Sequence, residues 1–476
     1  MEGEGATNGR VHVISRRMVR PSTPPPATKE DEVEVINLTP LDLRLIRTDY
    51  LQKGILLPNP PVIAGGATTL VDAMEASFAR ALARFYPFAG RLAADERDDG
   101  TVTVSLRCTG EGAEFVHAVA PGIAAADIVS SIYTPAFVRD ELHSFDPAHG
   151  GEVAADEGLP LVSVQVTELA DGVFVGITLN HSVGDGTALW HFLNTWSEIN
   201  RRGVAGVGDD DDGDLSTPPP VLRRWFEATW PVPIPLPFAK LEDIARQVEQ
   251  TKVTECFLTF SGESVINLTS RANNEITGTA TITALQATMA HLWRAVCRAR
   301  RLPRQQVTSY TVVIDCRGHV EGIPRGYVGN AEAFGKAEAT AGEVEEKGLG
   351  WTAWQLSRAM SSFDEASFRE EVDTWVRRPE FLFITSLTFA GTAVATGSSS
   401  WSEVFGNNDF GWGMAVAVRS GAGNKTDGKA AVFEEPPELG GGMAVELCLA
   451  TDALERLVAD EEFMDAVSLP PGGLSG

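Results

Sequence analysis

Residues 173–199 read VFVGITLNHSVGDGTALWHFLNTWSEI, and this stretch decides the type of fold that the chain can adopt. Residues 173–179 are apolar and β-rich, which is typical of a buried strand. The apolar residues that follow recur at helical spacing: Leu189, Phe192, Leu193, Trp196 and Ile199. His181 therefore lies at a strand-to-helix junction, where glycines let the backbone turn sharply and leave one imidazole edge accessible.

The flanking sequence predicts sheets that mix strands with helices. Residues 161–168 form a second β-rich run, and the Asp171-Gly172 pair predicts a hairpin between the two runs. Residues 11–20 read as a strand, and residues 70–85 as an amphipathic helix that Pro87 stops. Its predicted core stripe is Leu70, Met74, Ser77, Phe78, Ala81, Leu82 and Phe85.

The second half of the chain shows a similar mixture. It reads as a strand, a short and a longer helix, a strand at 309–317, and a strand that leads into a helix capped near Thr451 or Asp452. Because neither half repeats a strict βαβ pattern, we predict α+β-like sheets in two domains.

Glycines, an acidic run and three prolines at residues 203–220 predict an exposed linker. We therefore divide the chain into an N-terminal domain (1–202), a crossover linker (203–232) and a C-terminal domain (233–476). The run Asp209–Asp212 with Asp214 has the composition of a cation site, but a solvated linker is the interpretation we prefer.

The charge balance excludes some partners. With 39 Lys and Arg against 65 Asp and Glu, the formal net charge is −26, so we expect neither nucleic acid nor an anionic membrane as the main partner. No apolar run reaches the length of a membrane span, and the first residues lack the apolar stretch of a signal peptide. We expect a cytoplasmic protein, whose three N-x-S/T sequons (Asn37, Asn267 and Asn424) are chance matches.

The five cysteines are scattered, with no CxxC and no Cys/His cluster. This pattern predicts neither a disulfide framework nor a metal site, and it favours a reducing compartment.

Several catalytic signatures are missing: GxxxxGK[ST], GxGxxG after a strand, GxSxG and HExxH. The remaining signal is the HxxxD spacing of His181 and Asp185, and histidine is the natural general base near neutral pH. Taken alone, the spacing fits a structural or surface histidine better. A Ser182 nucleophile activated by His181 is disfavoured, because adjacent side chains rarely face each other and no elbow glycines surround the serine.

A second signal is Asp409-Phe410-Gly411-Trp412-Gly413, which is expected by chance about 10⁻⁴ times in such a chain. Two glycines around a tryptophan favour a structural loop over direct catalysis. We expect burial of Trp412 to anchor this loop against its own domain.

Together, these two motifs resemble those of the plant BAHD acyl-CoA-dependent acyltransferases. Five other segments are similar to elements of that family: Leu38–Asp42 (LSPxD), Phe85–Arg91 (FYPLAGR), His291–Arg294 (HxWR), Asp315–Arg317 (DxR) and Tyr327–Asn330 (YFGN, with Val for Phe). The resemblance spans nearly the whole chain.

The resemblance implies two similar α/β domains, like those of chloramphenicol acetyltransferase, with a channel at their interface. His181 would be the catalytic base in that channel, while Asp185 faces away and pairs with Arg317. The loop that contains Asp409, Gly411 and Trp412 would be structural. Acyl-CoA would be the co-substrate, with no permanently bound cofactor, and monomers are usual in the family.

The chemistry of thioester acyl transfer agrees with these roles. A neutral His181 can take the proton of a hydroxyl or amine that attacks the thioester, and thiolate is a good leaving group, so no acyl-enzyme is needed. The oxyanion of the tetrahedral intermediate needs a hydrogen-bond donor. Ser400 and Trp401 lie in the region from which the family supplies one, although loop polarity explains Ser400 equally well.

The CoA phosphates need basic residues. Arg298, Arg300, Arg301 and Arg304 cluster after the HxWR segment, and Arg271 lies upstream. We select Arg271, Arg298 and Arg301 as candidate CoA contacts, with solvated surface charge as the alternative. Thr269 stands where relatives often have lysine.

We predict an acyl-CoA-dependent O- or N-acyltransferase that acts on a small specialised metabolite. The alternative is a catalytically silent family member that binds a ligand or partner, against which the intact His181 and the DFGWG sequence argue. The YVGNA sequence at 327–331 departs from the YFGNC of many malonyl-transferring relatives. We therefore assign no particular acyl donor or acceptor from the sequence.

Overall fold

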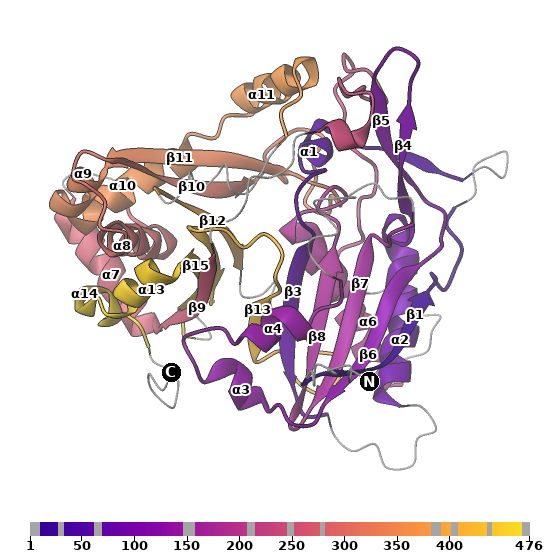
Figure 1. Cartoon of the computed structure of the whole chain (residues 1–476), viewed down its shortest axis with the longest axis horizontal. Helices are drawn as coiled ribbons and strands as arrows, with labels where there is room; N and C mark the ends of the chain where they lie inside the picture. Colours follow the sequence, from indigo (N-terminus) through magenta and orange to yellow (C-terminus); the bar gives the residue numbers. More distant parts are fainter. Residues whose placement is uncertain are drawn as a thin grey trace, which may run out of the picture.

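The computed structural model describes residues 10–26, 33–60, 69–145, 158–206, 215–244, 252–276, 281–381, 392–400, 408–435 and 440–468. Two large mixed sheets lie next to each other, and helices cover the outer side of each (Figure 1). The architecture is the predicted one, with two α/β domains.

The first sheet has six strands, in the order β1, β6, β7, β8, β3 and β13. Their bounds are β1 His12–Val19, β6 Ala113–Ala120, β7 Val162–Leu169, β8 Gly172–Leu179, β3 Leu51–Pro58 and β13 Ala417–Ser420. The strand predicted at 11–20 is confirmed as β1. The predicted hairpin is also confirmed, because β7 and β8 pair antiparallel with Val162 opposite Leu179.

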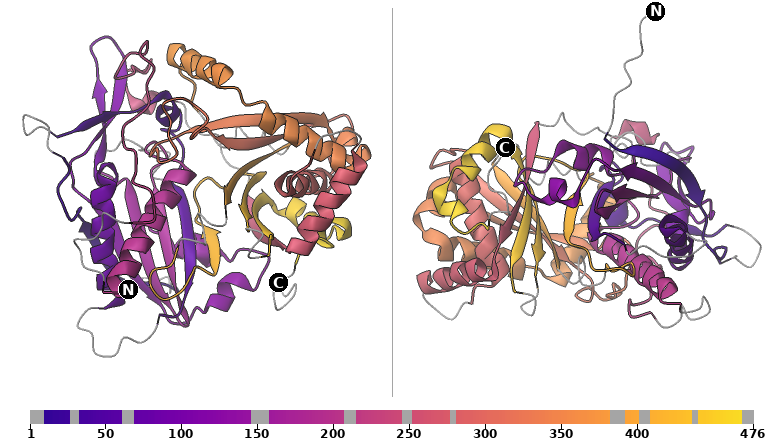
Figure 2. Two further views of the ribbon diagram at one scale, coloured as in Figure 1. Left: turned by 180° about the vertical axis from the view of Figure 1, so that it is seen from behind. Right: turned by 90° about the horizontal axis from the view of Figure 1, so that it is seen from below.

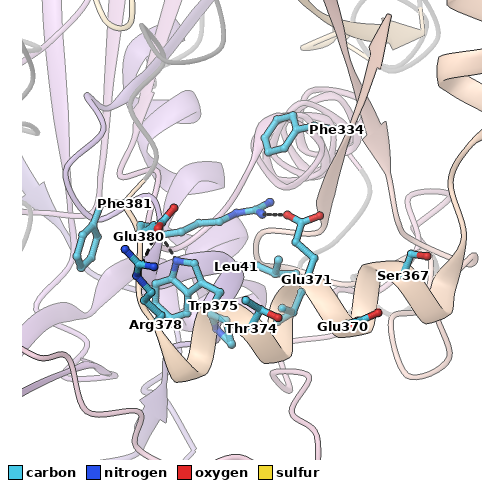
Figure 3. A pocket seen from close by; sticks show the side chains of 13 residues that line it. Leu41, Phe334, Ser367, Glu370, Glu371, Thr374, Trp375, Arg378, Glu380 and Phe381 are labelled. Atoms are coloured by element: carbon cyan, nitrogen blue, oxygen red, sulfur yellow. Dashed lines mark hydrogen bonds and ion pairs between the residues drawn. The ribbon is translucent and has the colours of Figure 1, made fainter.

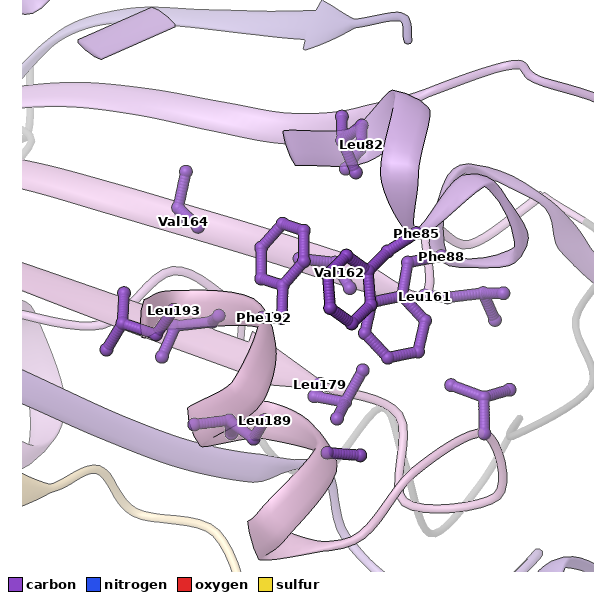
Figure 4. Packing of buried hydrophobic residues seen from close by; sticks show 14 of the residues in the cluster. Leu82, Phe85, Phe88, Leu161, Val162, Val164, Leu179, Leu189, Phe192 and Leu193 are labelled. Atoms are coloured by element: carbon purple, nitrogen blue, oxygen red, sulfur yellow. The ribbon is translucent and has the colours of Figure 1, made fainter. Parts of the chain in front are cut away.

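Helices α2 (Leu70–Arg84) and α6 (Gly186–Val204) pack together on one face of this sheet. The Nε1 of Trp196 in α6 donates to the carbonyl of Met74 in α2. Figure 4 shows the core that they enclose, where Phe192 meets Phe85 and Phe88 edge to face at centroid distances of 5.3 and 5.6 Å. The predicted apolar stripe of α2 is buried except for Leu70, which is half-buried.

The second sheet has the order β11, β10, β12, β14, β15 and β9, and its central β10, β12 and β14 run parallel. The bounds are β11 Glu332–Thr340, β10 Val307–Asp315, β12 Ala393–Ser400, β14 Lys429–Glu434, β15 Met443–Ala450 and β9 Val253–Phe260. Its covering helices are α7 Gly262–Glu275, α8 Ala284–Ala299, α9 Ala341–Glu346, α10 Gly348–Ser361, α13 Thr451–Val458 and α14 Glu461–Met464 (Figure 2).

The predicted cap of the last long helix is wrong. Helix α13 begins at Thr451 after Ala450, which provides no side-chain cap. The Thr451 hydroxyl hydrogen-bonds to the Thr254 hydroxyl instead, and Asp452 pairs with Arg456 one turn later.

Smaller elements surround the two sheets. A three-stranded sheet is formed by β2 Val35–Asn37, β5 Val102–Arg107 and β4 Arg91–Glu96. The short helices are α1 Pro40–Leu43, η1 Tyr86–Ala89, α3 Ala125–Val129, α4 Ala136–Glu141 and η3 Leu241–Asp243, and α11 Glu365–Arg377 projects from the second domain (Figure 1).

One strand crosses between the predicted domains. Strand β13 belongs by sequence to the predicted C-terminal domain but pairs with β3 as the edge strand of the first sheet. The predicted boundary at 202/203 falls inside α6, and the acidic run at 209–214 lies outside the described residues. The sequence boundaries stay predictions, whereas this strand exchange is a feature of the fold.

Among the described residues, no helix combines the length and hydropathy needed to span a bilayer. Within the same ranges, no group of His, Cys, Asp and Glu side chains could hold a metal ion. The five cysteines are free and buried.

Candidate active site

His181 lies in the turn between β8 and α6, and its backbone is held on both sides. The Asn180 Oδ1 accepts from the Ser182 amide at 2.9 Å. The Asn330 Nδ2 donates to the His181 carbonyl at 2.8 Å. The turn ends where Asp185 caps α6 by accepting from the Ala188 amide. The imidazole is therefore positioned by groups from both domains.

His181 is 7% exposed and lines a cavity. Its Nδ1 is buried and has no hydrogen-bond partner among the described residues, which leaves Nε2 as the nitrogen available to the cavity. Burial lowers the pKa of His181 to about 4, against the opposing effect of the Asp185 charge. The ring is therefore neutral at pH 7 and can accept a proton.

Asp185 points away from the cavity and joins the two domains. Its Oδ1 accepts from the Arg317 Nη2 at 2.9 Å, and both side chains are almost fully buried. Its Oδ2 accepts from the Ala331 amide at 2.9 Å. The pairing of Asp185 with Arg317 that the family resemblance implied is thus confirmed.

Arg317 is bound on all sides. Its Nε donates to the Tyr327 carbonyl, its Nη1 to Asp315 and its Nη2 also to the Gly329 carbonyl, at 2.8–2.9 Å. These bonds fix the YVGN segment against the turn that carries His181.

Residues with no predicted role at the site complete this network. The Asp42 Oδ1 accepts from the backbone amide and the Nδ2 of Asn330, at 3.0 and 2.9 Å. Arg224 donates to the carbonyls of Val183 and Val328 at 2.9 and 2.6 Å. Asp42 and Asn330 occur in the segments that carry the family resemblance. Arg224 stands in the predicted crossover linker, where no local pattern marks a buried arginine.

The cavity has a volume of about 230 Å³ and is formed by both domains. From the first half of the chain it is lined by Leu45, Leu51, Lys53, His181, Gly186, Thr187 and Trp190. From the second half it is lined by Val313, Asp315, Glu332, Phe334, Ala395, Thr396, Gly397, Asn424, Lys429, Ala430, Ala431 and Phe433. Its walls combine apolar surface with a few charged groups, as is typical of small-molecule sites.

A model of the "Transferase family" matches residues 9–464 of the chain. The chain belongs to the BAHD acyltransferase family. It is 32% identical to an uncharacterised acetyltransferase of Arabidopsis thaliana, over 96% of this chain and 99% of that protein. It is 30% identical to the BAHD acyltransferase DCR of the same plant, over 96% of this chain and 92% of that protein. The crystal structure of vinorine synthase shares the fold, with 18% identity, a TM-score of 0.71 and coverage of 97% and 99%.

As a BAHD acyltransferase, the chain takes acyl-CoA as co-substrate. The three arginines selected as CoA contacts do not line the His181 cavity. Arg271 pairs with Glu275, Arg298 pairs with Asp460, and both also lie within 3.5 Å of Glu462. Arg301 is exposed just after α8, with φ +53°. Their contacts with CoA stay predictions.

The predicted oxyanion donors in this BAHD acyltransferase also stay predictions. Ser400 is the last residue of β12, and Trp401 lies outside the described residues. Thr187 is a further hydroxyl-bearing residue that lines the cavity, whereas the Thr396 hydroxyl hydrogen-bonds to the Tyr310 hydroxyl on the other face of the sheet.

The DFGWG loop has a structural geometry. The Asp409 Oδ1 accepts from the Gly411 and Gly413 amides at 2.8 and 3.0 Å, and both glycines have positive φ (+111° and +132°). Side chains rarely adopt this conformation, which explains the two glycines. The loop therefore closes on its own aspartate, as the structural interpretation predicts.

The expected anchoring of this loop is wrong in two respects. It packs on the first domain, where the Trp412 Nε1 donates to the Pro58 carbonyl and the Asn200 Nδ2 donates to the Phe410 carbonyl. Phe410, which is 0% exposed and stacks edge to face on Trp196, is the buried anchor, whereas Trp412 is half-buried. The reason is that the loop leads directly into β13, the edge strand of the first sheet.

A second cavity of about 740 Å³ lies between α1 and α11 (Figure 3). Its walls include Trp375 and Glu371 from α11 and Arg44, which lies 3.8 Å from Glu371. Phe334 lines both this cavity and the one that contains His181, so the two share a wall.

Proposed function

We propose that this BAHD acyltransferase moves an acyl group from acyl-CoA to a hydroxyl or amine of a small specialised metabolite, with His181 as general base and no acyl-enzyme. The observation that carries the proposal is the neutral His181 imidazole, held by both domains and lining a cavity between them.

The proposed reaction uses this geometry. The Nε2 of His181 accepts the acceptor proton while the acceptor oxygen or nitrogen attacks the thioester carbonyl. The tetrahedral intermediate then releases CoA thiolate, which the imidazolium proton can neutralise. A serine nucleophile finds no support, because the Ser182 Oγ is buried without a hydrogen-bond partner among the described residues.

Asp185 and Arg317 act through the backbone in this proposal. Among the described residues, the Asp185 carboxylate accepts hydrogen bonds from Arg317, Ala188 and Ala331, so we assign it to positioning the turn that carries His181 and not to proton transfer. We assign Asp409, Gly411 and Trp412 the same kind of structural role in their own loop. The oxyanion donors Ser400 and Trp401 and the CoA contacts Arg271, Arg298 and Arg301 belong to the proposal on the family resemblance alone.

We further propose a cytoplasmic monomer whose partners are acyl-CoA and the acceptor, without nucleic acid or membrane. The strongly acidic composition supports this view.

The test is a screen of the purified protein. It is incubated with acetyl-, malonyl-, benzoyl- or coumaroyl-CoA and an acceptor library, and free thiol and acylated product are measured by absorbance and mass spectrometry. We expect acceptor-dependent thiol release that the His181→Ala variant lacks. A folded protein that binds acyl-CoA but yields no product with any pair would support the catalytically silent alternative.

A further inference from the structure

The floor of the His181 cavity is one face of the second sheet. Because alternate residues of a strand point to the same side, this face carries Glu332 and Phe334 of β11, Val313 and Asp315 of β10, Ala395 and Gly397 of β12, and Lys429, Ala431 and Phe433 of β14. Acidic side chains thus stand on β10 and β11, and a lysine stands on β14.

The two ends of this floor are far apart. Thr311 of β10 pairs with Ala395, which in turn pairs with Lys429, and Asp315 lies four residues beyond Thr311. With about 4.8 Å between strands and about 3.3 Å per residue, the Cα atoms of Asp315 and Lys429 are about 16 Å apart. The acidic end therefore cannot pair with Lys429.

The acidic end of the floor, formed by Asp315 and Glu332, also carries little unpaired negative charge. Asp315 accepts from Arg317 at 2.9 Å. Burial raises the pKa of Glu332 to about 8, so this carboxyl is largely protonated at pH 7.

Behind Lys429 lies a buried ionic cluster with more lysines than glutamates. Lys425 donates to both Glu255 and Glu446, at 2.5 and 2.7 Å. Lys53 donates to the Ser420 hydroxyl at 2.6 Å and lies 3.8 Å from Glu446. Lys53, Lys425 and Lys429 thus face two carboxylates, and the buried Arg419 guanidinium also interacts with Glu446, so positive charge is in excess.

This excess charge faces the cavity. Lys53 and Lys429 both line it, and among the described residues no carboxylate lies within ion-pair distance of Lys429. Burial and the neighbouring Lys53 and Lys425 lower the pKa of Lys429 to about 8, so it is still mostly protonated at pH 7. Lys429 is half-buried, and a partly desolvated cation without a carboxylate partner is costly. An anion that enters the cavity would relieve that cost.

We propose that Lys53 and Lys429 bind a carboxylate group of the substrate beside His181. The proposal rests on the proposed function, because it assumes that acceptor and acyl group meet in this cavity. The anion is not a CoA phosphate, since the long pantetheine arm separates the phosphates from the thioester that must reach His181. The carboxylate belongs either to the acceptor or to a dicarboxylic acyl group such as malonyl.

A binding experiment tests the subsite without relying on turnover. Benzoate and benzamide have the same ring and differ in charge, and their affinities are measured by calorimetry on the parent, Lys429→Met and Lys53→Met proteins. The parent should bind benzoate at least tenfold more tightly than benzamide, and each substitution should remove most of that preference. Lys347→Met, at an exposed lysine that pairs with Glu343, is the matched control and should keep it.

Kinetics with pairs of substrates that differ only in the carboxylate then identify whether the acceptor or the acyl group carries it. If the acceptor carries it, Lys429→Met lowers the kcat/KM ratio of a carboxylate acceptor over its methyl ester by tenfold or more. If the acyl group carries it, the ratio of malonyl-CoA over acetyl-CoA falls instead. A parent protein that binds benzoate no better than benzamide and favours neither carboxylate substrate would overturn the subsite. Charge-selective binding without any turnover would overturn only the proposed function.

Discussion

The carboxylate of Asp185 and the guanidinium of Arg317 form a buried ion pair of 2.9 Å between the turn before α6 and the turn after β10. The exposed fraction of their side chains is 0% and 2%. Each group has further hydrogen bonds within its surroundings, so removal of one charge leaves the other buried and unpaired. The pair therefore couples the stability of the domain contact to the position of His181.

Asp185→Asn should therefore lower the melting temperature together with the activity. Loss of one partner of a buried pair typically costs about 3–5 kcal/mol in the free energy of unfolding. The measurement is thermal unfolding alongside kcat/KM. Unchanged stability with lost activity would instead indicate a catalytic His-Asp dyad.

His181→Ala should reduce acyl transfer by a factor of about 10²–10⁴, because general-base catalysis typically contributes that much. The fold should persist, which circular dichroism and the melting temperature can check. His319→Ala, at an exposed histidine near Arg317, is the matched control. Near-normal turnover of the His181 variant would refute its assignment as the base.

The low pKa of His181 predicts a specific pH profile. Since burial lowers the folded-state pKa from 6.5 to about 4, the base stays unprotonated down to about pH 5, and kcat/KM should fall only as the pH approaches 4. An acidic limb near 6.5 in a protein that is still folded would contradict this assignment.

The lowered pKa of His181 also makes the free energy of unfolding depend on pH. Between pH 6.5 and 4 the unfolded chain binds protons that buried histidines do not, so the stabilisation is present above 6.5 and decreases as the pH falls towards 4. Burial also lowers the pKa values of His143 and His291 to about 4, and these two act in the same direction. Urea unfolding at pH 7.5, 6 and 5 should show a decreasing free energy of unfolding. His143→Phe should reduce the slope between pH 6.5 and 5.

In the DFGWG loop, Phe410→Ala should destabilise the protein more than Trp412→Ala. Removal of a fully buried aromatic side chain typically costs about 3–5 kcal/mol, and Phe410 is 0% exposed whereas Trp412 is half-buried. Both variants should keep acyl-CoA affinity in their folded fraction, because neither residue lines the His181 cavity. A selective loss of CoA affinity at parental stability would show that the loop binds ligand.

The sequence by itself determined the features that depend on short-range pattern. The β-rich runs with their Asp171-Gly172 turn placed the β7–β8 hairpin, and helical spacing placed helices α2 and α6 and the turn that carries His181. The residues that specify these elements are close together in the chain. The pairing of Asp185 with Arg317 came from the family resemblance, since no local pattern links residues so far apart.

Only the tertiary structure decided how distant segments meet. The return of β13 to the first sheet moved the anchor of the DFGWG loop to the other domain. Packing of the two sheets brought Lys53 of β3 and Lys429 of β14 to the same cavity, next to the ion pairs of Lys425. The low pKa of His181 likewise depends on how completely both domains bury it. These properties depend on packing and desolvation. Both arise from contacts between residues that are far apart in the chain, so a local sequence pattern does not reveal them.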